Sequence, residues 1–306
     1  MTVAATKKGR LAFGDFRTWY RITGTAGGDR PALVVLHGGP GSTHDYLLSL
    51  AALAAEGWPV VHYDQLGSGG STHLPERGAD FWSVDLFRAE LANLLRGLGV
   101  GDDYVLFGHS WGGVLAARHA ADRPAGLRGL VVADSPASYV LWRAEMTRLR
   151  AALPDGTDEI LRAHEAAGTT SSAAYHRAAR EFIDRHVCRV KPWPRDYRAS
   201  HLEMADDPTV YAVMNGPSEF HVTGSLRDYS VEEFLPRIEV PTLVLTGRHD
   251  EATPATVQPF LDLVPDVRSV VFEESSHVPH LEEPERFHEV LTGFLTRLGA
   301  RTPERL

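Results

Sequence analysis

Short apolar runs alternate with amphipathic or small-residue stretches along most of the chain. A short run of consecutive apolar residues is typical of a strand that is buried on both faces of a parallel sheet. An additional pair of strands, joined by a turn at Gly14-Asp15, is expected over residues 13–22. The apolar strands are expected at residues 32–36, 59–63, 104–107, 130–133, 241–247 and 268–272.

Helical periodicity fills most of the intervals between these strands. Ser83 is a suitable N-cap for one helix, and Pro284 suits the first turn of the last helix. Strands and helices that alternate through short connections predict an α/β fold with a doubly wound, mostly parallel central sheet flanked by helices. Right-handed crossovers then gather the functional loops at the carboxyl ends of the strands. The helices are expected at residues 44–55, 84–98, 111–122, 255–263 and from 284 onward.

The alternation stops at residues 136–236, which show helical periodicity and no convincing apolar strand. We interpret this segment as a helical cap inserted into a core that consists of residues 1–135 and 237–306. A long disordered insertion is the alternative, but it would not carry so many aromatic residues. The aromatic residues of the segment include Trp142, Tyr175, Trp193, Tyr197, Tyr211 and Phe220.

The segment Gly108-His109-Ser110-Trp111-Gly112 lies between an expected strand and an expected helix. Such a turn is so sharp that its serine projects out of the sheet, and only glycine tolerates the crowding on either side. The helix that follows directs free backbone N–H groups toward the same point. The pattern therefore predicts that Ser110 is a nucleophile.

A serine nucleophile needs a base within hydrogen-bonding reach, and the base needs an orienting acid. After such a turn the chain order is serine, acid, histidine. Asp250 follows the strand at 241–247 and His277 follows the last strand, so they are the expected acid and base. Asp134 as acid and His280 as base are alternatives. Because the chain has 15 histidines, the candidate base is identified only by its position after the last expected strand.

The oxyanion of the transition state needs two preorganised N–H donors. One expected donor is the backbone N–H of Trp111, which directly follows the nucleophile. The other expected donor is Gly39, in the loop His37-Gly38-Gly39-Pro40-Gly41 after the first apolar strand. His37 is expected to have a structural role, and His109 lies beside the nucleophile but cannot fold back onto it.

Composition and motifs exclude several other function classes. The net charge is -9, with 40 acidic and 31 basic residues, which disfavours nucleic acid or an anionic membrane as a partner. No apolar run approaches the ~18 residues of a membrane span, and residues 1–8 lack the apolar region of a signal peptide. The glycine-rich loop at 64–71 matches neither a P-loop nor a dinucleotide fingerprint, and no cluster has metal-ligand spacing. No cofactor and no metal are expected.

Cys188 is the single cysteine of the chain, so no disulfide framework can form within it. A catalytic role for this thiol is a minor alternative, because the residue lies in a stretch of helical character. Nothing in the sequence requires an oxidising compartment, and a cytoplasmic location is expected.

Five segments of the chain are informative together: residues 37–41, 64–71, 108–113, 215–220 and 247–254. With them the chain resembles the proline iminopeptidase family of α/β hydrolases. The resemblance covers nearly the whole chain and implies a serine-aspartate-histidine triad at Ser110, Asp250 and His277. It also implies that Glu219 and Glu251 bind the free amino terminus of the substrate, as a carboxylate pair can by charge-assisted hydrogen bonds. The pair Arg248-His249 departs from the family, where an aromatic residue is common before the aspartate.

The resemblance implies a serine aminopeptidase that releases an N-terminal residue, preferably proline, from short peptides or amino-acid amides through an acyl-enzyme. A serine amidase or esterase that acts on another amine-bearing small molecule is the alternative, because it would share the same catalytic residues. A catalytically silent ligand-binding protein would be expected to lack part of this machinery. The sequence gives no indication of the oligomeric state.

Overall fold

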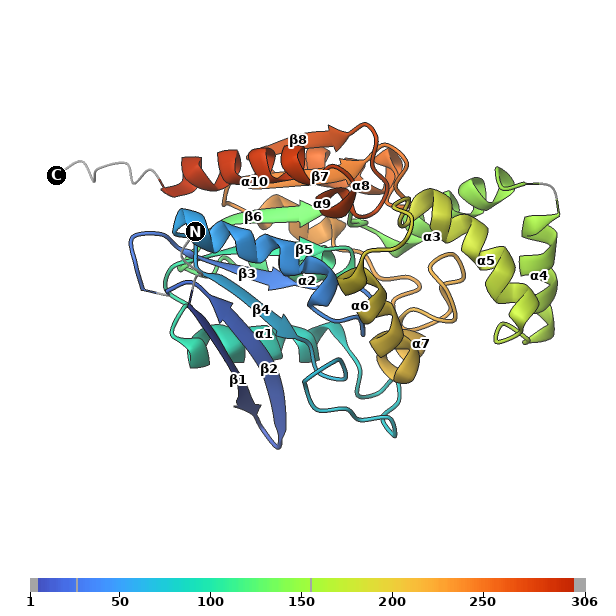
Figure 1. Ribbon diagram of the computed structural model, residues 1–306, viewed down its shortest axis with the longest axis horizontal. Helices are drawn as coiled ribbons and strands as arrows, with labels where there is room; N and C mark the ends of the chain where they lie inside the picture. The colour runs from blue at the N-terminus through green and yellow to red at the C-terminus, as the bar shows by residue number, and fades with distance from the viewer. Residues whose placement is uncertain (1–4, 26, 155, 300–306) are drawn as a thin grey trace.

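A computed structural model describes residues 5–25, 27–154 and 156–299 of the chain. Eight strands form one sheet in the order β1-β2-β4-β3-β5-β6-β7-β8 (Figure 1). Strands β3 to β8 run parallel to one another, whereas β2 pairs antiparallel with both β1 and β4. The strands are β1 Thr6–Phe13, β2 Phe16–Thr23, β3 Ala32–Leu36, β4 Val60–Asp64, β5 Tyr104–His109, β6 Leu127–Ala133, β7 Thr242–Gly247 and β8 Val267–Phe272. The predicted α/β fold with a mostly parallel sheet is confirmed.

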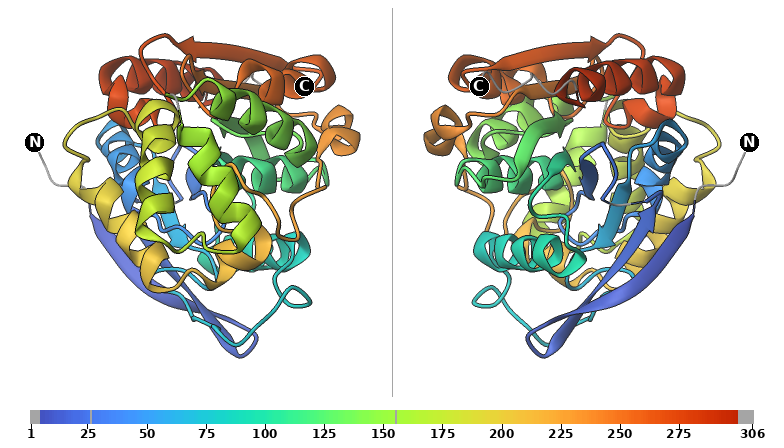
Figure 2. Two further views of the ribbon diagram at one scale, coloured as in Figure 1. Left: turned by 90° about the vertical axis from the view of Figure 1, so that its right-hand side faces the viewer. Right: turned by 90° about the vertical axis from the view of Figure 1, so that its left-hand side faces the viewer.

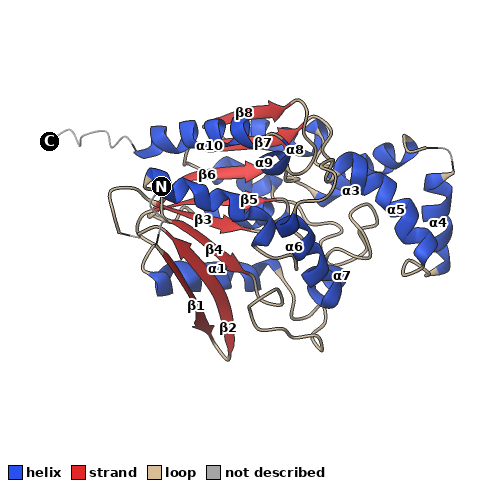
Figure 3. Ribbon diagram, in the orientation of Figure 1, coloured by secondary structure: helices blue, strands red, loops and turns tan. Residues whose placement is uncertain are grey.

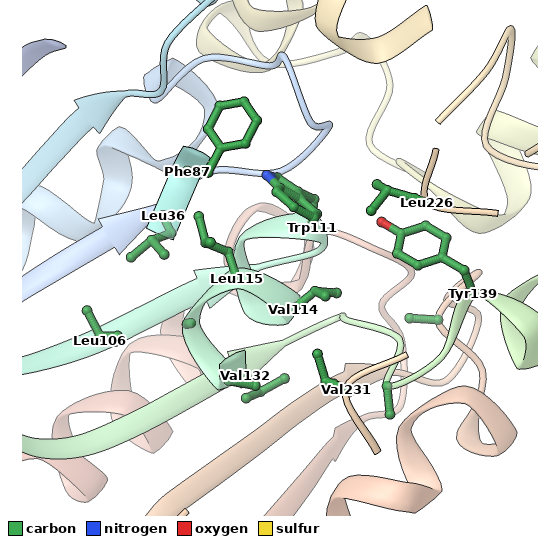
Figure 4. Packing of buried hydrophobic residues seen from close by; sticks show 14 of the residues in the cluster. Leu36, Phe87, Leu106, Trp111, Val114, Leu115, Val132, Tyr139, Leu226 and Val231 are labelled. Atoms are coloured by element: carbon green, nitrogen blue, oxygen red, sulfur yellow. The ribbon is translucent and has the colours of Figure 1, made fainter. Parts of the chain in front are cut away.

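Helices cover both faces of the sheet (Figure 3). Successive residues of β3 face opposite sides, so Val34 packs in one hydrophobic cluster and Val35 in the other. Helices α1, α2 and α8 contribute to the first cluster, and η1 and α10 contribute to the second. Figure 4 shows Leu36 and Leu106 of the sheet with Trp111 of α2 in the first cluster. These helices are η1 Asp45–Glu56, α1 Val84–Leu98, α2 Trp111–Ala120, α8 Pro254–Leu263 and α10 Pro284–Gly299.

The segment between β6 and β7 is helical and lies beyond the carboxyl ends of the parallel strands (Figure 1). The left view of Figure 2 looks onto it, with its helices in front of the sheet. We call residues 136–236 the helical insertion, and its described residues contain no strand. It comprises α3 Tyr139–Ala151, α4 Thr157–Ala167, α5 Ala173–His186, α6 Arg195–Asp206, α7 Thr209–Met214 and η2 Glu232–Arg237.

Local details differ from the sequence predictions in several places. The strand pair expected over residues 13–22 is longer, since β1 begins at Thr6. The helix expected at 44–55 is the 3₁₀ helix η1, because apolar periodicity does not distinguish i+3 from i+4 hydrogen bonding. The short helix α9 (Pro279–Glu282) was not predicted, since one turn is too short to show a period. Cys188 lies just beyond the end of α5 at His186. Residues 1–4 and 300–306 of the predicted core lie outside the described residues.

Within the described residues, no helix combines the length and the apolar character that crossing a membrane requires.

Candidate active site

Ser110 occupies the turn between β5 and α2 with φ 56° and ψ −125°, outside the regions that a non-glycine residue normally adopts. Both flanking glycines are required by close backbone contacts. A Cβ atom on Gly108 would lie 2.2 Å from the carbonyl oxygen of Gly112, and a Cβ on Gly112 would lie 2.2 Å from that of Leu36. This turn places Ser110 in the wall of a small cavity of about 50 Å³.

Asp250 and His277 come from the loops after β7 and β8 and form a direct hydrogen bond. The distance between Nδ1 of His277 and Oδ1 of Asp250 is 2.7 Å. The backbone N–H of Ala252 donates to the same oxygen at 2.8 Å, which fixes the carboxylate. Because Nδ1 then carries the proton, Nε2 of His277 is the basic nitrogen. His277 lines the same cavity as Ser110.

The environment of His277 adjusts its pKa in two opposing ways. Burial lowers the pKa, because a charged imidazolium is poorly solvated in the protein. The charge and hydrogen bond of Asp250, together with the charges of Glu219 and Glu282, outweigh burial, so the pKa lies above the usual value. A ring in this state is a stronger base than a free histidine.

The two expected oxyanion donors lie on either side of Ser110. Trp111 is the first residue of α2, so its backbone N–H has no acceptor within the helix. Gly39 lines the cavity with φ 108°, and a Cβ at that position would lie 2.7 Å from the nitrogen of Gly41. A Cβ atom on the adjacent Gly38 would lie 3.0 Å from the Cβ of Ser110, so this loop passes close to the serine.

Gln65 joins the two segments that carry these donors, a role that sequence reasoning missed. Its Oε1 accepts a hydrogen bond from the indole Nε1 of Trp111 at 2.9 Å. Its Nε2 donates to the carbonyl oxygen of His37 at 2.8 Å, and its backbone N–H donates to Nε2 of His37 at 2.9 Å. The sequence analysis assigned no role to Gln65, although this residue belongs to one of the segments that carry the resemblance.

Glu219 and Glu251 both line the cavity. Glu251 is 1% exposed, and its Oε1 lies 3.7 Å from Nε2 of His277. Its Oε2 is buried and has no hydrogen-bond partner among the described residues. Glu219 belongs to the helical insertion, where Tyr211 hydrogen-bonds its carboxylate and Trp142 Nε1 donates to its backbone oxygen at 2.8 Å.

Burial raises the pKa of both glutamates. The charges of Glu219 and Asp250 raise the pKa of Glu251 further, whereas Tyr211 and His277 partly offset the effect on Glu219. Glu251 is buried with one unpartnered oxygen and Glu219 is half-buried, and both line one cavity, where their carboxyl groups could accept hydrogen bonds from a cation.

Another part of the cavity wall comes mostly from α6 of the helical insertion. The hydroxyl of Tyr197 is buried there and has no hydrogen-bond partner among the described residues. Sequence reasoning identified Tyr197 only as an aromatic residue of the insertion. The side chains of this wall are Val187, Tyr197, Ser200, His201 and Met204.

The alternative acid and base have other partners. Asp134 is fully buried at the end of β6, and its Oδ1 accepts a hydrogen bond from the backbone N–H of Gly247 at 3.2 Å. Burial and the nearby charge of Asp250 raise its pKa well above the usual value. Nε2 of His280 donates to the carbonyl oxygen of Tyr46 at 3.0 Å.

Cys188 and the Arg248-His249 pair are absent from the cavity wall, as far as the described residues define it. Cys188 is fully buried, and burial raises the pKa of its thiol to about 12. Arg248 forms a surface ion pair with Glu273 at 2.8 Å, so the departure from the family pattern lies outside the site. No group of histidine, cysteine, aspartate and glutamate in the described part of the chain is arranged to bind a metal.

Comparisons with known proteins agree on one family. The model of the alpha/beta hydrolase fold family matches residues 31–284. The proline iminopeptidase of Saccharolobus solfataricus is 36% identical over 280 residues, which cover 92% of this chain and 89% of that protein. The crystal structure of a proline iminopeptidase from Mycobacterium smegmatis is 48% identical with a TM-score of 0.89, covering 96% of this chain and 99% of that one. The crystal structure of VinJ is 65% identical with a TM-score of 0.94, covering 95% and 99%. The chain therefore belongs to the α/β hydrolase fold family and, within it, to the proline iminopeptidase family.

Proposed function

We propose that the protein is a serine aminopeptidase that hydrolyses the bond after an N-terminal residue, preferably proline, in short peptides or amino-acid amides. The observation that carries this proposal is the position of Glu219 and Glu251 in the wall of the cavity that Ser110 and His277 also line. A positive amino terminus bound by the two carboxylates would place the first carbonyl group of the substrate near the serine.

Acylation would then follow the chemistry of a serine-histidine-aspartate triad. Oγ of Ser110 attacks the carbonyl carbon while Nε2 of His277 takes the hydroxyl proton. Asp250 keeps the other ring nitrogen protonated and stabilises the imidazolium. The N–H groups of Trp111 and Gly39 stabilise the oxyanion, and each donor of this kind is worth roughly 3–4 kcal/mol.

The imidazolium of His277 next gives its proton to the leaving amine, and the scissile bond breaks. Water enters, His277 takes one of its protons, and the resulting hydroxide attacks the ester carbonyl. Collapse of the second tetrahedral intermediate returns the proton to Oγ of Ser110 and releases the free amino acid. The helical insertion supplies most of the opposite wall of the cavity and so limits the size of the acyl residue.

The carboxylate pair suits an N-terminal proline for a chemical reason. A secondary ammonium has two N–H donors, and the cavity offers two carboxyl groups to accept them. The raised pKa of Glu251 shows that its charge is poorly compensated when the cavity holds no cation. An ammonium group removes that repulsion, which favours a charged substrate over a neutral analogue. The names of the relatives support the preference for proline.

A pair of matched substrates tests the proposal. Proline p-nitroanilide should be hydrolysed, and N-acetylproline p-nitroanilide, which lacks the ammonium charge, should not. Glu219→Gln and Glu251→Gln should each raise KM for the free-amine substrate by about 10- to 100-fold, as expected for a charge-assisted hydrogen bond worth about 1.5–3 kcal/mol. Glu159→Gln, at an exposed position of α4, is the matched control and should leave KM unchanged.

Equal rates on the acetylated and free substrates would overturn the role of the two glutamates. A panel that adds esters and amides of other amines separates the peptidase from the alternative amidase or esterase, which would prefer one of those compounds. We also infer a cytoplasmic location, which the single buried cysteine supports.

A further inference from the structure

A buried chain of hydrogen bonds connects the oxyanion loop with the backbone of the triad histidine. The backbone N–H of Gly38 donates to the hydroxyl of Tyr46 at 2.8 Å. That hydroxyl lies 2.8 Å from Nδ1 of His109, and Nε2 of His109 lies 2.7 Å from the carbonyl oxygen of His277. Tyr46 is 6% exposed and His109 is 1% exposed.

The donor and the acceptor of each hydrogen bond in this series follow from the groups at its two ends. At the His277 end, a carbonyl oxygen can only accept, so Nε2 of His109 carries a proton and donates it. A neutral imidazole then has an unprotonated Nδ1, which must accept a hydrogen bond from the hydroxyl of Tyr46. The N–H of Gly38 points at the lone pairs of that hydroxyl. Each group therefore has one role, and no proton position is left open.

The surroundings of His109 keep it neutral. Its ring packs at centroid distances of 5.2 Å on Tyr46, 4.8 Å on His277 and 5.6 Å on His280. The only carboxylate recorded near it among the described residues is that of Asp134, 3.8 Å from Nε2. Burial and the two neighbouring histidines lower the pKa of His109 well below the usual value. A ring that stays neutral preserves the bonding pattern across the working pH range.

We propose that Tyr46 and His109 are positioning residues that set the oxyanion loop and the backbone of His277 at fixed places on either side of Ser110. This inference rests on the proposed function, because it assigns Gly39 as a donor and His277 as the base. Both residues line the cavity, but the proposed role requires neither of them to contact the reacting atoms. Each acts on the transition state through the group that it orients, so it should affect kcat more than KM.

Three substitutions each remove different hydrogen bonds from the series that connects Gly38 with His277. Tyr46→Phe removes the hydroxyl and leaves the N–H of Gly38 and Nδ1 of His109 unpartnered. His109→Gln can keep a donor near the position of Nε2 and so keep the bond to His277, but it loses the acceptor for Tyr46. His109→Asn can keep the acceptor for Tyr46 and loses the donor to His277.

All three variants should lower kcat by about 10- to 100-fold, as expected when one oxyanion donor or the base is displaced, with KM within about 2-fold. His109→Asn should also move the acid limb of the rate profile to lower pH, because a displaced His277 loses part of the effect of Asp250. His109→Gln and Tyr46→Phe should leave that limb in place. The matched control is Tyr104→Phe, which breaks another buried tyrosine–histidine bond, 2.7 Å to Nε2 of His119, at the far end of β5.

Tyr104→Phe should lower the thermal midpoint and leave kcat unchanged. The proposal is overturned if Tyr46→Phe and His109→Asn retain kcat within 2-fold of the parent, or if the Tyr104→Phe variant loses kcat to the same extent. It is also overturned if His109→Gln and His109→Asn give the same pH profile. Rates are measured on folded protein, quantified by near-ultraviolet circular dichroism.

p-Nitrophenyl acetate serves as the second substrate, because this ester needs no ammonium site. Hydrolysis of the ester without any hydrolysis of proline p-nitroanilide would contradict the proposed aminopeptidase, while the ester rates of the variants would still test the positioning role. Normal aminopeptidase activity with unaffected variants would contradict the positioning role alone.

Discussion

Asp250 accepts a hydrogen bond from Nδ1 of His277 at 2.7 Å, whereas Asp134, which also follows a strand of the same sheet, accepts from the backbone N–H of Gly247. The two carboxyl groups are close enough that the charge of Asp250 contributes to the raised pKa of Asp134. Burial and that charge therefore favour the neutral form of Asp134, whereas Asp250 holds the ring of His277.

This difference predicts opposite results for two equivalent substitutions. Asp250→Asn should lower kcat by about 10⁴-fold, because an asparagine can present its amide nitrogen to Nδ1 of His277 and favour the wrong tautomer. Asp134→Asn should retain kcat within about 10-fold, since an amide closely replaces a neutral carboxyl group. Steady-state hydrolysis of proline p-nitroanilide measures both. A larger loss in Asp134→Asn than in Asp250→Asn would reverse the assignment of the acid.

The pKa of His277 predicts the pH dependence of the reaction. The ring must be neutral at Nε2 to accept the proton of Ser110, so activity is lost as pH falls through its pKa. Because Asp250 raises that pKa above its usual value, kcat/KM should fall with a midpoint above 6.5. p-Nitrophenyl acetate is the appropriate substrate, as it carries no titrating amine. A midpoint below 6 would contradict the raised pKa.

The fold was predictable because the decisive signals are local. An apolar run such as Val34-Val35 needs cover on both faces, and Ser83 caps α1 as expected, accepting from the N–H of Leu86 at 3.2 Å. The placement of Asp250 and His277 after successive strands followed from the same pattern. By contrast, apolar periodicity carries no information about which strands become neighbours, so the position of β3 between β4 and β5 was not predicted.

The finer features of the site depend on side-chain geometry between distant segments. The contacts of Tyr46 with His109, and of Gln65 with Trp111, join residues 63 and 46 positions apart. Tyr197 lines the cavity because α6 of the insertion packs against η1. The pattern of apolar residues within α6 does not predict that contact. Glu219 and Glu251 came from the resemblance alone, since isolated glutamates are normally exposed.

Gln65 is expected to be required for the geometry of the oxyanion donors. Gln65→Glu keeps an acceptor for the indole of Trp111 but cannot donate to the carbonyl oxygen of His37, while Gln65→Leu loses both bonds. Gln65→Leu should lower kcat by about 10- to 100-fold, and either change leaves a buried polar group unpaired at a cost of about 1–3 kcal/mol of stability. Urea denaturation and arylamide kinetics measure the two effects. Unchanged kcat in Gln65→Leu would show that Trp111 and His37 hold their places without it.

Cys188 should be inert in the native enzyme. The thiolate is the reactive form, and a pKa of about 12 leaves about one thiol in 10⁵ ionised at pH 7. We expect no reaction with Ellman's reagent in native buffer, one thiol per chain in guanidinium chloride, and full activity after treatment with iodoacetamide. Cys188→Ala should retain kcat. Rapid native labelling accompanied by loss of activity would instead support a catalytic thiol.

Buried neutral histidines are expected to make the protein acid-sensitive. Burial lowers the pKa of His280 from 6.5 to about 4, so between these values the unfolded chain binds a proton that the native chain does not. The stabilisation is complete above pH 6.5 and is lost as the pH falls toward 4, by up to roughly 3 kcal/mol for this group. His37, whose pKa burial also lowers to about 4, adds a term of the same sign.

His280→Gln isolates the contribution of one histidine. Glutamine can keep a donor to the carbonyl oxygen of Tyr46, which Nε2 of His280 contacts at 3.0 Å, but it has no proton to gain. The free energy of unfolding of this variant, measured in urea at pH 7 and at pH 4.5, should fall by less than that of the parent protein. An equal fall in both proteins would mean that His280 is already protonated in the native state at pH 4.5, or that it titrates alike in both states, and either result would contradict its lowered pKa.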